Sequence, residues 1–159
     1  MSQNDQPSSA SALTSNYLQR FGGIGRLYGT AALTAFSKAH MVVIGLGGVG
    51  SWAAEALART GVGTLTLIEL DDICITNTNR QLHATTSHIG KQKNTTLSAR
   101  LLDINPELKL HTIEDFITTK NIAELITEEH HVVIDAIDSS SVKAALAAVC
   151  IHKKKHANK

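Results

Sequence analysis

The sequence predicts an α/β fold: a doubly wound, mainly parallel sheet with flanking helices. Short runs rich in β-branched residues alternate along the chain with longer segments of helical periodicity. A glycine-rich turn directly follows the first of these runs and opens a helix, as in nucleotide-binding βαβ units. Strands and helices that repeat in this order favour parallel strands joined by right-handed crossovers, so the expected architecture is Rossmann-like.

The expected elements start after a polar leader at residues 1–17, which lacks the basic and apolar regions of a secretory signal and is expected to be disordered. An extra helix is expected at 24–39, before the first strand. The predicted strands cover residues 40–45, 64–70, 108–114 and 131–137. The predicted helices that follow them cover residues 51–60, 91–104, 119–128 and 139–152.

One domain is expected over residues 18–159, because the sequence contains neither an internal repeat nor a linker. A chain of 159 residues can bury a sizeable core, and with only 4% aromatic residues that core must consist of Ala, Leu, Ile and Val. A sheet of this kind usually continues beyond a fourth strand, so we expect the domain to be incomplete at its C-terminal end. The order of the strands does not follow from the sequence.

Charge and cysteine content narrow the expected class of protein. A net charge of +1 argues against a protein that holds nucleic acid by charge alone. Cys74 and Cys150 lie far apart and form no CxxC pair, which argues against a zinc site and favours a reducing, cytoplasmic compartment. Since Cys74 stands between two isoleucines, we expect it to be a small buried core residue. No apolar run is long enough to predict a membrane span.

The glycine turn VVIGLGGVGSW predicts a nucleotide site. Gly45, Gly47 and Gly50 satisfy the G-x-G-x-x-G pattern, which lets the backbone and a helix N-terminus approach a polyphosphate closely. Glu69 follows about twenty residues later, where an acid accepts hydrogen bonds from ribose hydroxyls. The alternative is that the glycines only allow tight packing of strand against helix.

A dense polar set follows Glu69 and is not explained by dinucleotide binding. It consists of Asp71, Asn77, Arg80, Gln81 and Lys93. An asparagine, an arginine and a lysine that converge near a phosphate site suit the charge of a triphosphate. Taken singly, each also has a plainer interpretation: Arg80 as a surface ion pair and Lys93 as a solvated helix residue.

Several segments together resemble the adenylating domain of the ubiquitin-activating-enzyme-like superfamily, over about residues 18 to 152. They are GLGGVGSWAAEALARTGVGTLTLIELDD, TNTNRQ, GKQK, NP and VVIDAIDS. Within that superfamily, RFGGIGRLYG, DDICITNTNRQLHA and VIDAIDS followed by KAAL are most similar to the tRNA threonylcarbamoyladenosine dehydratase branch. This resemblance implies ATP-dependent cyclisation of the threonylcarbamoyl group on an anticodon-loop adenosine, through an acyl-adenylate.

The resemblance also implies roles for single residues. Asn77, Arg80 and Gln81 match the N-x-x-R-Q motif over the phosphates, Lys93 matches a phosphate-binding lysine, and Asp138 matches the acid that holds Mg²⁺. The implied ATP-binding set is Gly45, Gly47, Gly48, Gly50, Glu69, Asp71, Asn77, Arg80, Gln81, Lys93 and Asp138. The implied catalytic set is Arg80, Lys93 and Asp138, with Arg26 or Arg20 as an arginine finger supplied by the partner subunit of a homodimer.

Other functions stay open on the sequence alone. The same chemistry could act on the C-terminal carboxylate of a ubiquitin-like sulfur carrier, and a sulfur-transfer protein stays open as a partner beside tRNA. An NAD-dependent oxidoreductase is disfavoured by the N-x-x-R-Q motif and Asp138. A further hypothesis is a fragment that binds a nucleotide but catalyses no reaction. The lysines at 153–155 are either tRNA contacts or a solvated helix end.

Overall fold

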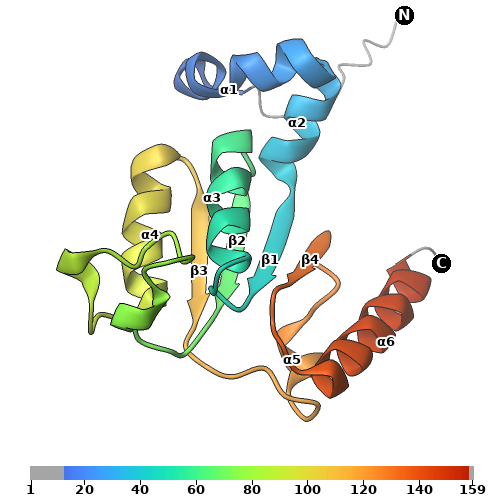
Figure 1. The fold of residues 1–159 in the computed structure, drawn as a ribbon. Coiled ribbons are helices and arrows are strands. Elements are labelled where there is room, and N and C mark those ends of the chain that lie inside the picture. The colour runs from blue at the N-terminus through green and yellow to red at the C-terminus, as the bar shows by residue number, and fades with distance from the viewer. Residues whose placement is uncertain (1–12, 158–159) are drawn as a thin grey trace, which may run out of the picture.

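A parallel four-stranded sheet with helices on both faces forms the centre of the protein (Figure 1). The computed structural model describes residues 13–157, with side chains as far as Lys153. The helical elements are α1 Ser15–Tyr28, α2 Thr30–Lys38, α3 Gly50–Thr60, η1 Ile75–Asn77, η2 Thr86–His88, α4 Lys93–Ile104, α5 Ile122–Leu125 and α6 Ser140–Ala157. The strands are β1 His40–Ile44, β2 Thr64–Ile68, β3 Lys109–Ile113 and β4 Val132–Asp135. All four predicted strands are confirmed, each shorter than expected.

The strand order, which the sequence left open, is β3-β2-β1-β4. Every neighbouring pair is parallel, with Met41 of β1 opposite both Leu65 of β2 and Val132 of β4. The chain therefore steps outward from β1 in one direction and returns to the other side of β1 with β4. This reversal beside β1 is the place where open α/β sheets bind ligands.

The two faces of the sheet carry separate apolar cores. Helices α3 and α4 cover one face, and α5 and α6 lie on the other (Figure 1). The first core contains Val43, Leu46, Ala54, Ala58, Val62, Leu65, Leu67, Leu97, Leu101 and Leu108. The second contains Val42, Ile44, Ile68, Ile122, Ile126 and Leu146. Both consist of aliphatic residues, as the composition predicts. Within residues 13–157, no helix combines the length and apolar character that a membrane span needs.

The N-terminal region differs from the prediction in two respects. Gly29, with a φ of 92°, breaks the single helix expected at 24–39 into α1 and α2. Helix α1 begins at Ser15, capped by the side chain of Thr14, so the leader is wrong for its last residues. Tyr17 is buried there, and its hydroxyl donates to the carbonyl of Gly61. Residues 1–12 of the expected leader lie outside the described residues.

The helix expected at 119–128 is also shorter, because only Ile122–Leu125 is helical. The side chain of Asn121 accepts a hydrogen bond from the Thr118 backbone and donates to the carbonyl of Phe116. A short polar side chain that bonds to nearby backbone in this way offers the chain an alternative to helix. The segment between β3 and α5 is therefore a loop stabilised by Asn121.

The glycine turn after β1 is so tight that a side chain is excluded at two of its positions. Gly45 has a φ of 84°, a conformation that residues with a side chain rarely adopt. Gly50 lies against Gly45, and a Cβ at Gly50 would stand only 1.8 Å from the Gly45 carbonyl oxygen. At Gly47, by contrast, a Cβ would meet nothing closer than the Gln81 amide nitrogen at 3.9 Å.

We expect Gly50→Ala to destabilise the protein by about 3 kcal/mol or more, because the added methyl group collides with backbone that cannot move aside. Urea unfolding followed by circular dichroism measures this loss. Gly47→Ala is the matched control within the same turn and should change the free energy of unfolding by less than about 1 kcal/mol. Equal stability of the two variants would contradict the packing described for Gly50.

Candidate nucleotide site

An open cavity of about 610 Å³ lies at the carboxyl ends of the strands, beside the point where the strand order reverses. Its wall comes from the glycine turn after β1, the end of β2, the turn η1, the start of α4 and the loops that follow β3 and β4. The predicted residues that line it are Gly45, Gly47, Gly48, Glu69, Asp71, Asn77, Arg80, Gln81, Lys93 and Asp138. Residues spread over almost a hundred positions of the sequence thus meet in one place.

Three of the predicted site residues do not line this cavity. Gly50 packs against Gly45 beneath it. Arg20 and Arg26 lie on α1, at the other end of the sheet (Figure 1). Arg20 donates to the carbonyl of Ile104, which precedes β3, and the Arg26 guanidinium lies beside the glycines of its own helix. Neither arginine belongs to the cavity of its own chain.

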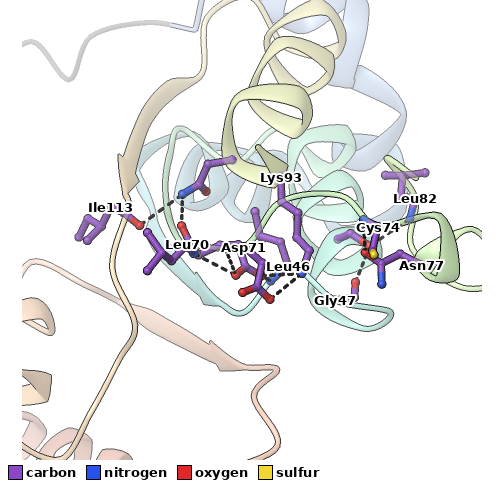
Figure 2. A network of polar contacts seen from close by, with 12 residues as sticks. Leu46, Gly47, Leu70, Asp71, Cys74, Asn77, Leu82, Lys93 and Ile113 are labelled. Atoms are coloured by element: carbon purple, nitrogen blue, oxygen red, sulfur yellow. Dashed lines mark hydrogen bonds and ion pairs between the residues drawn. The ribbon is translucent and has the colours of Figure 1, made fainter. Parts of the chain in front are cut away.

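Glu69 joins the separate segments of the site. Its Oε2 accepts a hydrogen bond from the Leu46 backbone at 2.8 Å, and its Oε1 accepts from the backbones of Leu70 and Asp71 at 2.9 and 3.0 Å. Figure 2 shows these contacts around Leu46, Leu70 and Asp71. The expected ribose acceptor is thus also a structural acceptor, because it ties the glycine turn to the end of β2. Only 8% of the residue is exposed.

Lys93, the first residue of α4, is buried beside Glu69 and is not the solvated residue of the plainer interpretation. Its Nζ lies 3.0 Å from Asp71 Oδ2 and 3.5 Å from Glu69 Oε2 (Figure 2). The Asp71 side chain remains 54% exposed toward the cavity. Two carboxylates thus pair with one buried ammonium group, and all three residues line the cavity.

Asn94 is a structural member of the site that the sequence did not indicate. Its Nδ2 donates to the carbonyl of Glu69 at 2.6 Å and to that of Ile113 at 3.3 Å (Figure 2). These carbonyls follow β2 and end β3, so one side chain joins the two strand ends to α4. The only sequence signal was its place next to Lys93 in the first turn of a helix.

The N-x-x-R-Q motif lies over the glycine turn. Asn77 Oδ1 accepts from the Cys74 backbone at 2.9 Å and so caps the turn η1 (Figure 2). The Arg80 stem lies across Gly48, where an added Cβ would come within 3.1 Å of it. Gln81 lines the cavity, although only 7% of the residue is exposed. Its Oε1 is buried and has no hydrogen-bond partner among the described residues, which is uncommon for a buried polar atom.

Asp138 lies exposed in the loop between β4 and α6, on the other side of the cavity from Lys93. The base of this loop is held by Asp135, whose Oδ1 accepts from Lys143 Nζ at 2.9 Å and from the Ile137 backbone at 3.2 Å. No group of three or more His, Cys, Asp or Glu residues in the described part of the chain could hold a metal. A cation bound at Asp138 would take its remaining oxygen ligands from water or from a bound molecule.

The loop after β3 forms a wall of the cavity that sequence reasoning missed. Asp115, Phe116 and Ile117 all line it, and the Phe116 ring is 55% exposed. The Asp115 carboxylate accepts a hydrogen bond from the Phe116 backbone, which fixes the loop beside the site. The sequence signal was only positional: the segment follows a strand in a parallel sheet, at the edge where ligands bind.

The cysteines do not share one environment. The expectation that Cys74 is buried is wrong, because Cys74 and Ile75 are both exposed and only Ile73 enters the core. The turn η1 starts directly after Cys74 and ends the apolar run that suggested burial. Cys74 is not among the cavity-lining residues. Cys150 is half-buried on α6, and burial raises the pKa of its thiol, as expected of a small core residue.

His83, which follows the Arg80–Gln81 pair, is 2% exposed and does not line the nucleotide cavity. Neither of its ring nitrogens has a partner among the described residues. Burial, together with the nearby positive charge of Lys93, lowers the pKa of His83 to about 4, so the ring is neutral at pH 7. It borders a smaller cavity of about 420 Å³ beside α4.

The sequence of this chain is similar to one protein family and to several curated proteins. The model of the ThiF family matches residues 23–158. The tRNA threonylcarbamoyladenosine dehydratase of Escherichia coli (strain K12) is 53% identical over 136 residues, which are 86% of this chain and 51% of that protein. The sulfur carrier protein ThiS adenylyltransferase of the same strain is 33% identical over 112 residues, 70% of this chain and 44% of that protein. The chain spans about half the length of the curated relatives it matches.

Solved structures agree with the fold. The E. coli tRNA N6-threonylcarbamoyladenosine dehydratase in complex with AMP superposes with a TM-score of 0.87 at 50% identity, over 91% of this chain and 59% of that chain. The complex of the same enzyme with ATP superposes with a TM-score of 0.84 at 49% identity, over 90% and 59%. The α/β architecture expected from the sequence is confirmed by this likeness.

Replacing Glu69 with Gln should lower the free energy of unfolding by about 2 kcal/mol. The amide keeps one acceptor oxygen for three backbone donors and removes a charge partner of buried Lys93. Asp71→Asn is the matched control, because its exposed side chain keeps an oxygen for Lys93, and it should cost less than about 1 kcal/mol. Urea titration of both variants makes the comparison. A larger loss in Asp71→Asn would contradict the role given to Glu69.

Acidification should destabilise the protein through His83. Between about pH 4 and 6.5 the unfolded chain binds a proton on this residue that the folded chain does not, so its contribution is complete above pH 6.5 and is lost as the pH falls. Between pH 7.5 and 4, the wild type should lose about 2–3 kcal/mol more unfolding free energy than His83→Gln. Urea unfolding at several pH values tests this. Parallel pH profiles would refute it.

Proposed function

The chain belongs to the ThiF family, and we propose that its cavity binds Mg-ATP and uses it to activate a carboxylate as an acyl-adenylate. The observation that carries this proposal is the set of charges around the glycine turn. Two cationic side chains line the cavity, buried Lys93 in its pairs with Glu69 and Asp71, and Arg80 with its stem across Gly48; the carboxylate of Asp138 lines it too. This arrangement suits a triphosphate that carries a divalent cation.

The nucleotide is proposed to lie across the reversal point of the sheet. Its phosphates face the glycine turn, where Gly47 and Gly48 allow close approach at the start of α3. The ribose lies near Glu69 and half-exposed Asp71. The base meets the apolar wall of the cavity, to which Phe116, Ile117 and Val142 contribute. In support, the solved relatives named above were crystallised with AMP and with ATP.

The chemistry proposed for this site needs no nucleophile from the protein. A carboxylate oxygen of the substrate attacks the α-phosphorus of ATP, and the bond from that phosphorus to the bridging oxygen breaks, which releases pyrophosphate. Catalysis then consists of alignment and charge neutralisation. Lys93 and Arg80 offset the charge that develops on the phosphates, and the Gln81 amide provides a polar group at the same wall.

The residues fit Mg²⁺ of the kind that accompanies a nucleotide. Mg²⁺ is usually held by one or two carboxylates together with phosphate oxygens and water, and Asp138 supplies a single exposed carboxylate at the cavity. When bound, the ion would neutralise phosphate charge beside that carboxylate. The Asp135–Lys143 pair holds the base of the loop and thereby sets the place of Asp138.

The substrate is proposed to be threonylcarbamoyladenosine in tRNA. A urea nitrogen of the threonylcarbamoyl group attacks its own activated carboxyl, AMP leaves, and the ring closes with the net loss of water. The support is the difference in identity: 53% to the E. coli tRNA dehydratase against 33% to the ThiS adenylyltransferase. Action on a sulfur carrier is the second candidate within the family. An NAD-dependent oxidoreductase finds no support in this family.

The proposal includes a homodimer. Arg20 and Arg26 lie at the end of the sheet opposite the cavity, so neither can reach a nucleotide in its own chain (Figure 1). An arginine finger from α1 would therefore act only in the site of a second copy. Lys153 lies on α6, and the side chains of the two lysines after it are outside the described residues. For these lysines a solvated helix end is the favoured interpretation, and contact with tRNA is the alternative.

Mg-ATP should bind to the wild-type chain in calorimetric titration, and Asp138→Ala should weaken that binding at least tenfold. The variant loses the carboxylate for Mg²⁺ but no charge that contacts phosphate directly. In EDTA, ATP should bind the two proteins with similar affinity, because the carboxylate has no ion to hold. Asp103→Asn, on the exposed face of α4, is the matched control and should bind as the wild type does. Tight NAD binding without an ATP signal would defeat the proposal.

The substrate is tested with the same wild-type protein. Release of AMP from ATP should require tRNA that carries threonylcarbamoyladenosine, and the modified nucleoside should lose the mass of one water. The same tRNA without the modification is the control. AMP release that instead follows a sulfur carrier with a free C-terminal carboxylate would reject the tRNA substrate while retaining the adenylation chemistry.

A further inference from the structure

Trp52 is the single tryptophan of the sequence and the third residue of α3. Its ring is 54% exposed, so little of it belongs to a core. Its one polar atom, the indole Nε1, donates to the backbone carbonyl of Arg80 at 2.9 Å. The only hydrogen-bond donor of this exposed side chain thus binds Arg80, a residue of the proposed phosphate site. Packing alone does not explain such an aromatic residue.

The neighbouring Ser51 makes a second bond to the same segment. Its Oγ accepts from the Leu82 backbone at 3.2 Å and donates to the Gly47 carbonyl at 2.6 Å. Ser51 is buried. The first turn of α3 thus holds the chain on both sides of Gln81, with Trp52 on the Arg80 side and Ser51 on the Leu82 side.

The side chain of Arg80 depends on where its backbone is held. Its stem lies on Gly48, and its Nη1 donates to the Thr76 carbonyl at 3.2 Å and to Asn79 Oδ1 at 2.9 Å. The Arg80 backbone N–H donates to the carbonyl of Asn77 at 3.1 Å. The hydrogen bond from Trp52 holds the backbone carbonyl of Arg80. Both backbone polar groups of Arg80 are therefore held, and only its side chain is left to change conformation.

We propose that Trp52 is a positioning residue for Arg80: its indole N–H holds the Arg80 backbone so that the guanidinium reaches the phosphates of a bound nucleotide. This inference rests on the proposed ATP site. When ATP binds, the guanidinium exchanges its contacts with Thr76 and Asn79 for phosphate oxygens, while the Trp52 bond keeps the stem on Gly48. Arg80 is thus the single residue between Trp52 and the bound nucleotide, so the environment of Trp52 should change when the nucleotide binds.

Trp52→Phe tests the proposal, because it keeps an aromatic ring at this position and removes the N–H donor, together with part of the ring's bulk. It should weaken the binding of Mg-ATP about three- to tenfold in calorimetric titration, the effect of one hydrogen bond. The binding of adenosine should be unchanged, because adenosine has no phosphate for Arg80. An equal loss for both ligands would overturn the proposal and make Trp52 a general structural residue.

A double-mutant cycle isolates the path through Arg80. In the Arg80→Ala background, Trp52→Phe should have no further effect on Mg-ATP affinity, because the side chain that it positions is gone. A persistent threefold or greater effect would overturn the proposal. Arg80 has an exposed side chain, so its truncation should leave the thermal unfolding midpoint close to that of the wild type.

The fluorescence of Trp52 gives a second readout that needs no substitution at Trp52. Mg-ATP should change its emission in the wild type and leave it unchanged in Arg80→Ala at saturating nucleotide. If ATP binds calorimetrically but the wild-type emission is constant, the inference fails and the proposed function stands. If neither ATP nor adenosine binds the wild type, both the proposed function and the inference about Trp52 are rejected.

Discussion

The carboxylate of Glu69 is the constraint on which the site depends. Three backbone N–H groups and the ammonium of Lys93 converge on it, and they come from the glycine turn, the end of β2 and the start of α4. Donors gathered in this way need acceptor oxygens, since a buried N–H without a partner costs more than a hydrogen bond contributes. The protein supplies these oxygens itself through Glu69. The arrangement of the glycine turn, the end of β2 and Lys93 around Glu69, here called the Glu69 cradle, is therefore formed without a ligand. Asn94 extends the joint from the carbonyl of Glu69 to the end of β3.

A preformed cradle suits the chemistry proposed for it. In adenylation the protein stabilises the charge on the phosphates and aligns the reactants, and it supplies no reacting atom. One wall consists of the glycine turn, Glu69 and Lys93, in which Glu69 binds both of the others. The opposite wall is formed by the loops that carry Phe116 and Asp138, which are exposed. The hydrogen-bonded wall around Glu69 suits the binding of the nucleotide in one position. The exposed loops with Phe116 and Asp138 suit the entry and release of a substrate.

Much of this fold and site could be predicted from the sequence, for physical reasons that differ between residues. The strands carry continuous β-branched runs because both faces are covered, and the glycine pattern follows from contacts as short as that between Gly50 and Gly45. The break at Gly29 was missed because glycine within a helical pattern indicates a break only together with tertiary contacts, here the packing of Tyr17 and Phe21 of α1 with Leu33 of α2. The burial of Cys74 was misjudged because three apolar residues in a row need not all be buried: a turn begins after Cys74 and leaves both Cys74 and Ile75 exposed. Trp52 and Asn94 act through backbone carbonyls, and such contacts leave no mark in residue types.

The pairing of β1 with β4 also bears on how the molecule folds. Strands β1, β2 and β3 join neighbours that follow one another along the chain, whereas β4 must return to β1 across the longest closed loop of the sheet. The entropy of closing a loop grows with its length, and distant contacts slow folding. We therefore expect docking of β4 to be the late event, after the cradle around Glu69 has formed. Because Asp138 arrives with β4, capture of a metal-nucleotide complex would mark a chain whose folding is finished.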